Sequence, residues 1–204
     1  MRYLVLLLAV SCSREKPAPP PSVAPCTSRV FNASRVATPI KVDGELDDDA
    51  WSDAMPSGTL KGARDEKAMV AHTEARAVWD DDALYVALYA ADEDETSRDV
   101  MRVELGDLGL RVRVSPDGQT ECQPAAACEG VVAKTMADGT LNDASDDDEE
   151  WEAELRVPWA RLGGRPASRA VPFDVVREDR PKGQPQDQLL RWSRCGKLVL
   201  LDPS

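Results

Sequence analysis

Apolar and polar residues alternate along several short stretches of the chain, and this alternation is the pattern of β-strands. Residues 73–79 place apolar side chains at every second position. Residues 84–90 are apolar at almost every position, which predicts a central strand covered on both faces. Residues 80–83, of which the first three are acidic, separate the two stretches, so we expect them to form the turn of a hairpin.

Further alternating or apolar stretches occupy residues 110–114, 131–136, 151–157, 173–176 and 198–201. The Ser-Pro-Asp-Gly sequence at 115–118 is a turn signal, and Pro158 ends a strand before a single helical turn expected at 159–162. No segment keeps helical periodicity over three turns. The pattern therefore predicts an all-β fold, an antiparallel β-sandwich of the jelly-roll or immunoglobulin-like kind.

The N-terminal residues are predicted to lie outside this fold. Residues 3–10 form an apolar run that is too short to span a bilayer, which takes about 20 residues, but long enough for a signal peptide, assigned to 1–11. The residues before Cys12 resemble the lipidation motif of bacterial lipoproteins. A Pro-rich segment follows, so 12–35 is predicted to be a lipidated cysteine with a tether and 36–204 the domain. We expect an exported protein, anchored in the bacterial envelope by lipid alone, at the outer membrane.

Four cysteines remain after Cys12, and export would place them in an oxidising compartment. Four cysteines allow three pairings. Cys122 and Cys128 flank one short loop, so we expect them to pair with each other. Cys26 and Cys195 would then join the entry of the domain to its last strand.

The chain of 204 residues carries a net charge of −12, which argues against nucleic acid as a partner and is typical of a soluble surface. A glycosidase needs two carboxylates about 5–9.5 Å apart across a cleft, and the acidic residues lie in no recognisable catalytic motif. Nucleophile-elbow and phosphate-loop motifs are also absent from the sequence. We therefore expect a protein that is not an enzyme.

Five segments, taken in order, resemble the sequence blocks of carbohydrate-binding module family 9 and its DOMON-like relatives. They are IKVDGELDDDAW at 40–51, WDDDALYV at 79–86, WEAELRVPW at 151–159, and the segments 173–179 and 196–200. The resemblance covers roughly residues 36–202 and implies a β-sandwich. It also implies that the chain binds a polysaccharide or oligosaccharide without hydrolysing it, since modules of this family are usually attached to separate hydrolases.

Binding a sugar in water takes a flat aromatic platform for its C–H face and a few polar side chains for its hydroxyls. The resemblance places the platform at Trp192 and the polar groups at Arg113 and Glu104. Arg177 and Asp179, in the segment 173–179, are the further ligand-binding candidates.

The family has a second platform Trp, whose place would lie between Asp92 and Val103, and this chain has no aromatic residue there. The gap makes an adaptor that binds protein partners in the envelope the main alternative. The other four tryptophans are in phase with apolar neighbours, so we expect them in the core: Trp51, Trp79, Trp151 and Trp159.

The sequence contains candidate ligands for two cofactors. Acidic residues could hold a structural Ca²⁺, which relatives often contain; the candidate ligands are Asp81, Asp92 and Asp94, and residues 142–150 add six more acids. The DOMON-like resemblance also raises a haem-binding redox module, whose iron is held by Met with His or Lys. The candidate axial ligands would be His72, Met55, Met69, Met101 and Met136.

Overall fold

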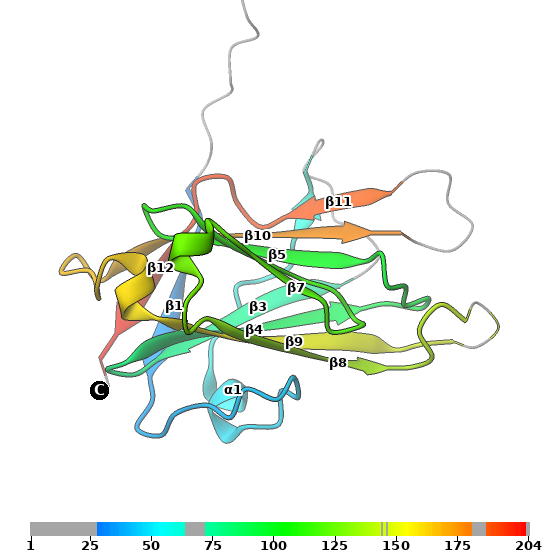
Figure 1. The fold of residues 1–204 in the computed structure, drawn as a ribbon, viewed down its shortest axis with the longest axis horizontal. Coiled ribbons are helices and arrows are strands. Elements are labelled where there is room, and N and C mark those ends of the chain that lie inside the picture. The colour runs from blue at the N-terminus through cyan, green and yellow to red at the C-terminus, as the bar shows by residue number, and fades with distance from the viewer. Residues whose placement is uncertain (1–27, 64–71, 144, 146, 181–186, 203–204) are drawn as a thin grey trace, which may run out of the picture.

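The computed structural model describes residues 28–63, 72–143, 145, 147–180 and 187–202. Twelve strands, one α-helix and two 3-10 turns make up this part of the chain (Figure 1). In chain order they are β1 Val30–Arg35, α1 Asp49–Asp53, β2 Lys61–Gly62, β3 Thr73–Trp79, β4 Ala83–Ala91, β5 Val100–Leu105, β6 Leu110–Val114, β7 Thr120–Gln123, η1 Ala125–Ala127, β8 Val132–Asp138, β9 Glu150–Pro158, η2 Trp159–Leu162, β10 Ala170–Asp179, β11 Gln188–Arg191 and β12 Lys197–Leu201.

The strands form two layers that share β10. The first layer runs β8-β9-β4-β3-β1-β12, and the second runs β7-β6-β5-β10-β11-β2. The N-terminal part of β10 pairs with β12, and its remainder pairs with β5 and β11. The predicted all-β sandwich is confirmed. The expectation of a wholly antiparallel arrangement is wrong for β1, which pairs in parallel with both β12 and β3.

The space between the layers is filled by the apolar side chains that alternate along the strands. From β3 and β4 come residues such as Ala77 and Leu88, and from β5 and β6 come Val103 and Val112, all essentially inaccessible to solvent. Burial of this apolar area is the main stabilising contribution to such a fold. Trp51, Trp79, Trp151 and Trp159 are buried as expected, although Trp51 belongs to a second, smaller cluster.

That second cluster lies on the outer side of the first layer, where the segment 36–54 with α1 packs against the sheet (Figure 1). Trp51 packs there with Tyr85 and other small or apolar residues. The carboxylate of Glu154 on β9 holds the segment in place, because it accepts hydrogen bonds from the Trp51 indole at 2.8 Å and from the backbone amides of Asp43 at 2.8 Å and Gly44 at 3.0 Å.

The Asp-Gly pair in this segment has a geometric cause. Gly44 has a φ of 106°, and a Cβ atom there would lie 2.6 Å from the carbonyl carbon of Thr135 on β8. Only glycine satisfies both the dihedral angle and the close approach. The glycine in the sequence block at 40–51 therefore allows this loop to pack closely against the sheet.

The hairpin turn predicted between β3 and β4 is confirmed. A carboxylate oxygen of Asp80 accepts hydrogen bonds from the amides of Asp82 at 2.8 Å and Ala83 at 2.7 Å. The other oxygen accepts the hydroxyl of Tyr85 at 2.9 Å. The single helical turn expected at 159–162 is also present, as η2.

The expected boundary between tether and domain at residue 36 is too late, because β1 already begins at Val30 and lies inside the sheet. The residues assigned to the signal peptide, Cys12 and most of the residues assigned to the tether lie outside the described part of the chain. Within the described residues, no helix has the length and apolar character needed to cross a membrane.

The disulfide Cys122–Cys128 is confirmed, with Cα atoms 5.8 Å apart. It joins β7 to the residue that follows η1. Cys195 is also disulfide-bonded. Its expected partner, Cys26, lies outside the described residues, so that pairing stays a prediction.

Candidate functional site

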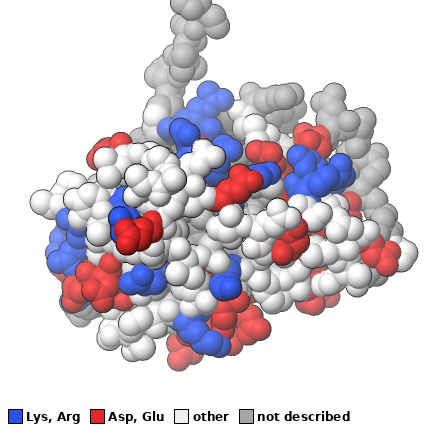
Figure 2. Space-filling view, in the orientation of Figure 1, with Lys and Arg blue, Asp and Glu red and all other residues white. Residues whose placement is uncertain are grey.

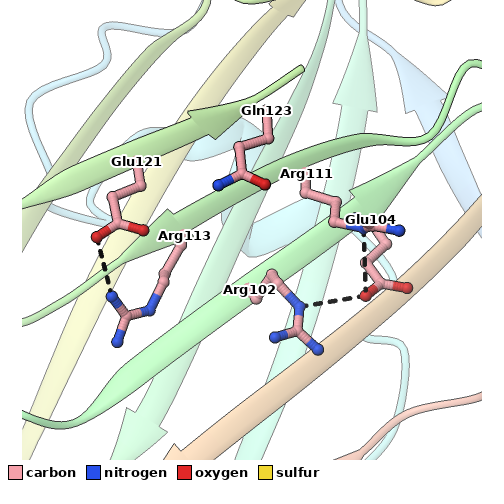
Figure 3. Close-up of a pocket in the computed structure, with 6 residues that line it drawn as sticks. All are labelled: Arg102, Glu104, Arg111, Arg113, Glu121 and Gln123. Carbon is pink, nitrogen blue, oxygen red and sulfur yellow. Dashed lines mark hydrogen bonds and ion pairs between the residues drawn. The ribbon is translucent and has the colours of Figure 1, made fainter. Parts of the chain in front are cut away.

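The outer face of the second layer carries polar side chains from three adjacent strands. Alternation along β5, β6 and β7 turns their apolar residues toward the core and the intervening residues outward. The outward residues line a hollow of about 350 Å³ (Figure 3). They are Arg102, Glu104, Arg111, Arg113, Glu121 and Gln123.

Ion pairs link these side chains, both within β5 and between adjacent strands. Arg113 pairs with Glu121 at 3.1 Å, and Arg102 with Glu104 at 3.1 Å (Figure 3). The guanidinium of Arg111 lies 4.0 Å from the carboxylate of Glu104, and its side chain is 58% exposed. The hollow therefore presents partly solvated guanidinium, carboxylate and carboxamide groups that can all form hydrogen bonds with a ligand.

A second hollow, of about 320 Å³, adjoins the first and shares Glu104 and Arg111 with it. Its wall includes Asp174 on β10, together with Arg194 and Lys197 near the start of β12. Figure 2 shows basic and acidic side chains interspersed on the face of the molecule drawn in Figure 1.

Asp174 is the buried member of this group. Its carboxylate is paired with Arg191 and accepts a hydrogen bond from the amide of Ser193 at 2.9 Å. Burial nevertheless raises the pKa of Asp174 to about 6. Asp174 thus fixes Arg191 in position, and it is 5% exposed.

The structure brings Glu104 and Arg113 to the same hollow, but the expectation that Trp192 lies beside them as an exposed platform is wrong. The Trp192 side chain is 3% exposed and packs edge-on against Phe31 and Phe173, with ring centroids 5.3 Å and 5.7 Å away. Its indole N–H donates to the carbonyl of Ser57 at 2.9 Å. A Cβ atom on Gly196 would meet the ring at 2.0 Å, so glycine there lets the indole lie against the backbone.

The alternation of inward and outward side chains along the strand explains the error. Leu190 and Trp192 point inward, and Arg191 between them points outward to Glu104, at 3.2 Å. The flanking arginines suggested an exposed indole. Consecutive side chains of a strand point to opposite faces, however, so an exposed Arg191 is compatible with a buried Trp192. In fact all five tryptophans and both phenylalanines of the chain are buried, so none of them offers a sugar a stacking surface.

The expectation that Arg177 and Asp179 belong to a ligand site on the surface is also wrong. Arg177 is fully buried, and its guanidinium bonds Asp92 at 2.8 Å, Asp179 at 3.0 Å and the hydroxyl of Thr73 at 3.0 Å. A ligand cannot reach these groups without unfolding the region around them. Their role in the described structure is to satisfy one another's charge and hydrogen bonds.

The buried cluster bears on the calcium expectation as well. Carboxylate oxygens of Asp92, Asp99 and Asp179 lie within 4.8 Å of one another, an arrangement that a cation could join. The cation already present is Arg177, bonded to two of them. Burial is the largest cause that raises the pKa of Asp92, to about 6, with Arg177 opposing it. Asp92 is thus held by a guanidinium.

The other calcium candidates differ from Asp92. Asp81 is exposed and paired with Arg35 and Arg165, and Asp94 lies in the turn after β4. In the acidic segment 142–150, Asp148 is buried and accepts the backbone amides of Thr140 and Glu95. Calcium binding stays a prediction.

The haem alternative gains no support from the described residues. Both ring nitrogens of His72 are engaged, one with the hydroxyl of Thr59 and one with the carboxylate of Glu74, each at 3.2 Å. Met101 is buried in the core, whereas Met55 is 58% exposed and Met136 lies on β8. Met69 lies outside the described residues.

Sequence reasoning named two of the residues at this site and missed the rest. Arg111 lies in the predicted strand at 110–114 but was not named as a site residue, and β7, which supplies Glu121 and Gln123, was not predicted as a strand. The signal was present in the alternation of Arg102 and Glu104 with apolar neighbours, and in the Glu-Cys-Gln sequence of β7.

No protein-family model and no curated protein matches the sequence. Among solved structures, a carbohydrate binding module family 9 protein from Caldicellulosiruptor kristjanssonii in complex with cellotriose superposes with a TM-score of 0.62 at 16% identity, over 86% of this chain and 95% of that one. The module from that organism in complex with glucose gives 0.61 at 17% identity, over 86% and 97%. A structure from Bacteroides uniformis gives 0.53 at 10% identity, over 85% and 99%. The superpositions cover nearly the whole of both family 9 modules, and they establish that this chain has the fold of carbohydrate-binding module family 9.

Proposed function

We propose that the protein binds carbohydrate without hydrolysing it, on the outer face of β5, β6 and β7. The observation that carries the proposal is the open hollow in which planar hydrogen-bonding groups from three strands converge. The fold supports it, because structures of this fold have been solved with cellotriose and with glucose.

The side chains of the hollow suit the hydroxyl groups of a sugar. A carboxylate accepts two hydroxyl hydrogen bonds, a guanidinium donates in a fixed fork, and a carboxamide does both. Glu104, Arg113 and Gln123 provide one of each from successive strands, and rigid strands hold their positions better than loops would. All the binding energy would come from polar contacts, which compete with water, so we expect modest affinity.

The remaining parts of the proposal concern location. Lipidation at Cys12 and the Pro-rich tether would hold the domain at the bacterial outer membrane, where exported saccharides are met. A single acyl chain binds membranes only marginally, so stable anchoring would need more than one chain. Metabolic labelling with a fatty acid analogue, compared between the chain and a Cys12→Ala variant, tests this part directly.

Carbohydrate binding is tested by applying the full-length protein to an array of oligosaccharides that includes cellotriose, followed by titration calorimetry on the strongest binder. We expect Gln123→Ala and Arg113→Ala each to weaken binding about ten-fold. Lys41→Ala is the matched control, because Lys41 is an exposed cation that is paired with Asp43 and does not line the hollow.

Two results would contradict the proposal. One is an array on which no saccharide binds the folded protein. The other is binding that is equally strong in the Gln123→Ala and Arg113→Ala variants, since this would place the saccharide elsewhere.

A further inference from the structure

The two adjoining hollows form one groove, defined here by all the residues that line one or the other. The groove carries an excess of positive charge. It contains five cationic side chains against three acidic ones: Arg102, Arg111, Arg113, Arg194 and Lys197 against Glu104, Glu121 and Asp174. The whole chain carries a net charge of −12. A local excess of positive charge on an acidic protein concentrates anions where the charge lies.

Several guanidinium groups converge on Glu104. Three guanidinium groups lie at hydrogen-bonding or ion-pairing distance from this one carboxylate: Arg102 at 3.1 Å, Arg191 at 3.2 Å and Arg111 at 4.0 Å. Asp174 neutralises Arg191. Arg102 has a second partner in Glu178, at 3.7 Å. Arg111, the more distant and more exposed, keeps most of its donors for a ligand.

The far end of the groove adds two more cations. Among the described residues, the guanidinium of Arg194 reaches a carbonyl oxygen, that of Ala63, at 3.4 Å. Lys197 is exposed at the start of β12 and belongs to the same wall. Cationic donors therefore extend along the groove from Arg113 to Lys197.

Stacking cannot supply the binding energy in this groove. The only aromatic residue among the described lining residues is Phe173, which is 2% exposed. Charge-assisted hydrogen bonds are about twice as strong as neutral ones, and a guanidinium matches a carboxylate or sulfate group in a bidentate fashion. A ligand with anionic groups would gain from this groove what a neutral sugar would not.

We propose that the ligand of the groove is an anionic saccharide, one that carries carboxylate or sulfate groups on neighbouring sugar units. This rests on the proposed carbohydrate binding and names the class of sugar. Arg111 and Lys197 recognise the anionic groups, while Glu104 and Gln123 accept and donate hydrogen bonds at the hydroxyls.

The test uses the same array with uronate and sulfated chains beside neutral ones, and an oligogalacturonate beside its methyl ester, which has the same linkages without the charge. We expect acidic chains to bind at least about ten-fold more tightly than neutral chains. We also expect their affinity to fall as salt is raised, because salt screens exposed charges.

Variants assign the effect to the groove. Arg111→Gln and Lys197→Gln should each reduce the preference for the free acid over the methyl ester by several-fold. Lys41→Gln removes the same charge from the protein outside the groove and should leave the preference unchanged.

The outcomes separate the two proposals. Equal binding of acidic and neutral saccharides, lost in Gln123→Ala, would overturn the anionic ligand and leave carbohydrate binding intact. Binding of a polyglutamate as tightly as of the best acidic saccharide would also overturn it, because the groove would then recognise charge alone. If no saccharide binds, both proposals are overturned.

Discussion

The two outer faces of the sandwich differ in how they meet their surroundings. Where the segment with α1 covers the outer face of the first layer, β3 and β4 present small and apolar residues such as Val78 and Ala87. The outer face of β5, β6 and β7 presents charged residues at the same alternating positions, and it is open to solvent. The covered face adds to the core, whereas the open face remains free for a ligand.

The difference teaches what decides whether a sheet face is covered. Covering charged side chains requires each charge to lose water, which is unfavourable unless each finds a partner. The carboxylates of β9 that meet the covering segment find donors there, because Glu154 accepts three hydrogen bonds and Glu152 accepts the backbone amide of Leu46. The charges of the open face pair with one another and stay in contact with solvent.

The largest expected effect comes from removing the anchor of the covered face. Trp51→Ala should lower the free energy of unfolding by about 3–5 kcal/mol, since it leaves a cavity and removes a donor from Glu154. Urea denaturation followed by circular dichroism measures the change. A loss of under about 1 kcal/mol would show that the segment 36–54 contributes little to the fold.

An intermediate effect on the free energy of unfolding is expected from the ionisation of one buried carboxyl group. Glu95, between β4 and β5, is 1% exposed, and burial with the neighbouring carboxylate of Asp148 raises its pKa to about 7. Because its pKa is raised in the folded state, the stabilising contribution of Glu95 is present below about pH 4.5 and is lost as the pH rises through 7.

The free energy of unfolding should therefore fall between pH 5 and pH 8, and Glu95→Gln should reduce that fall by about 1–2 kcal/mol. Denaturation at several pH values in the presence of a chelator measures it. An identical pH dependence in the variant and the parent would show that Glu95 ionises as an exposed carboxyl group does.

The smallest effect is expected on the open face. Arg113 and Glu121 form an ion pair that is 41% and 61% exposed, so replacing either with Ala should change the free energy of unfolding by no more than about 1 kcal/mol. A double-mutant cycle for the two residues measures their coupling. A coupling above about 2 kcal/mol would make this pair a structural element and weaken its assignment to ligand binding.

The fold could be predicted where apolar residues alternate over a whole strand. The strands β3, β4, β6 and β9 were visible for this reason, and so was the turn at Asp80. The strand β1 was assigned to the tether, because its sequence VFNASR mixes small polar residues with two apolar ones. Its place in the sheet depends on parallel pairing with β12, about 165 residues away, which no local pattern reports.

The site could be predicted only in part, for a related reason. Glu104 and Arg113 line the same hollow, but the resemblance also carried over a platform at Trp192 that this chain buries. Whether a residue faces inward depends on which side of its strand meets the other layer, and this is a property of strand pairing. Arg177 shows the limit most clearly, since a charged residue in a sequence is expected at the surface unless its partners are known.

The strand β10, which pairs with both layers, has a consequence for how the protein comes apart. Because β10 forms backbone hydrogen bonds with strands of both layers, loss of β10 from one layer also removes it from the other. We therefore expect the sandwich to denature in a single step. Amide hydrogens at the centre of β10 are then expected to exchange with deuterium only through complete unfolding, and to report the stability of the whole domain from a single strand.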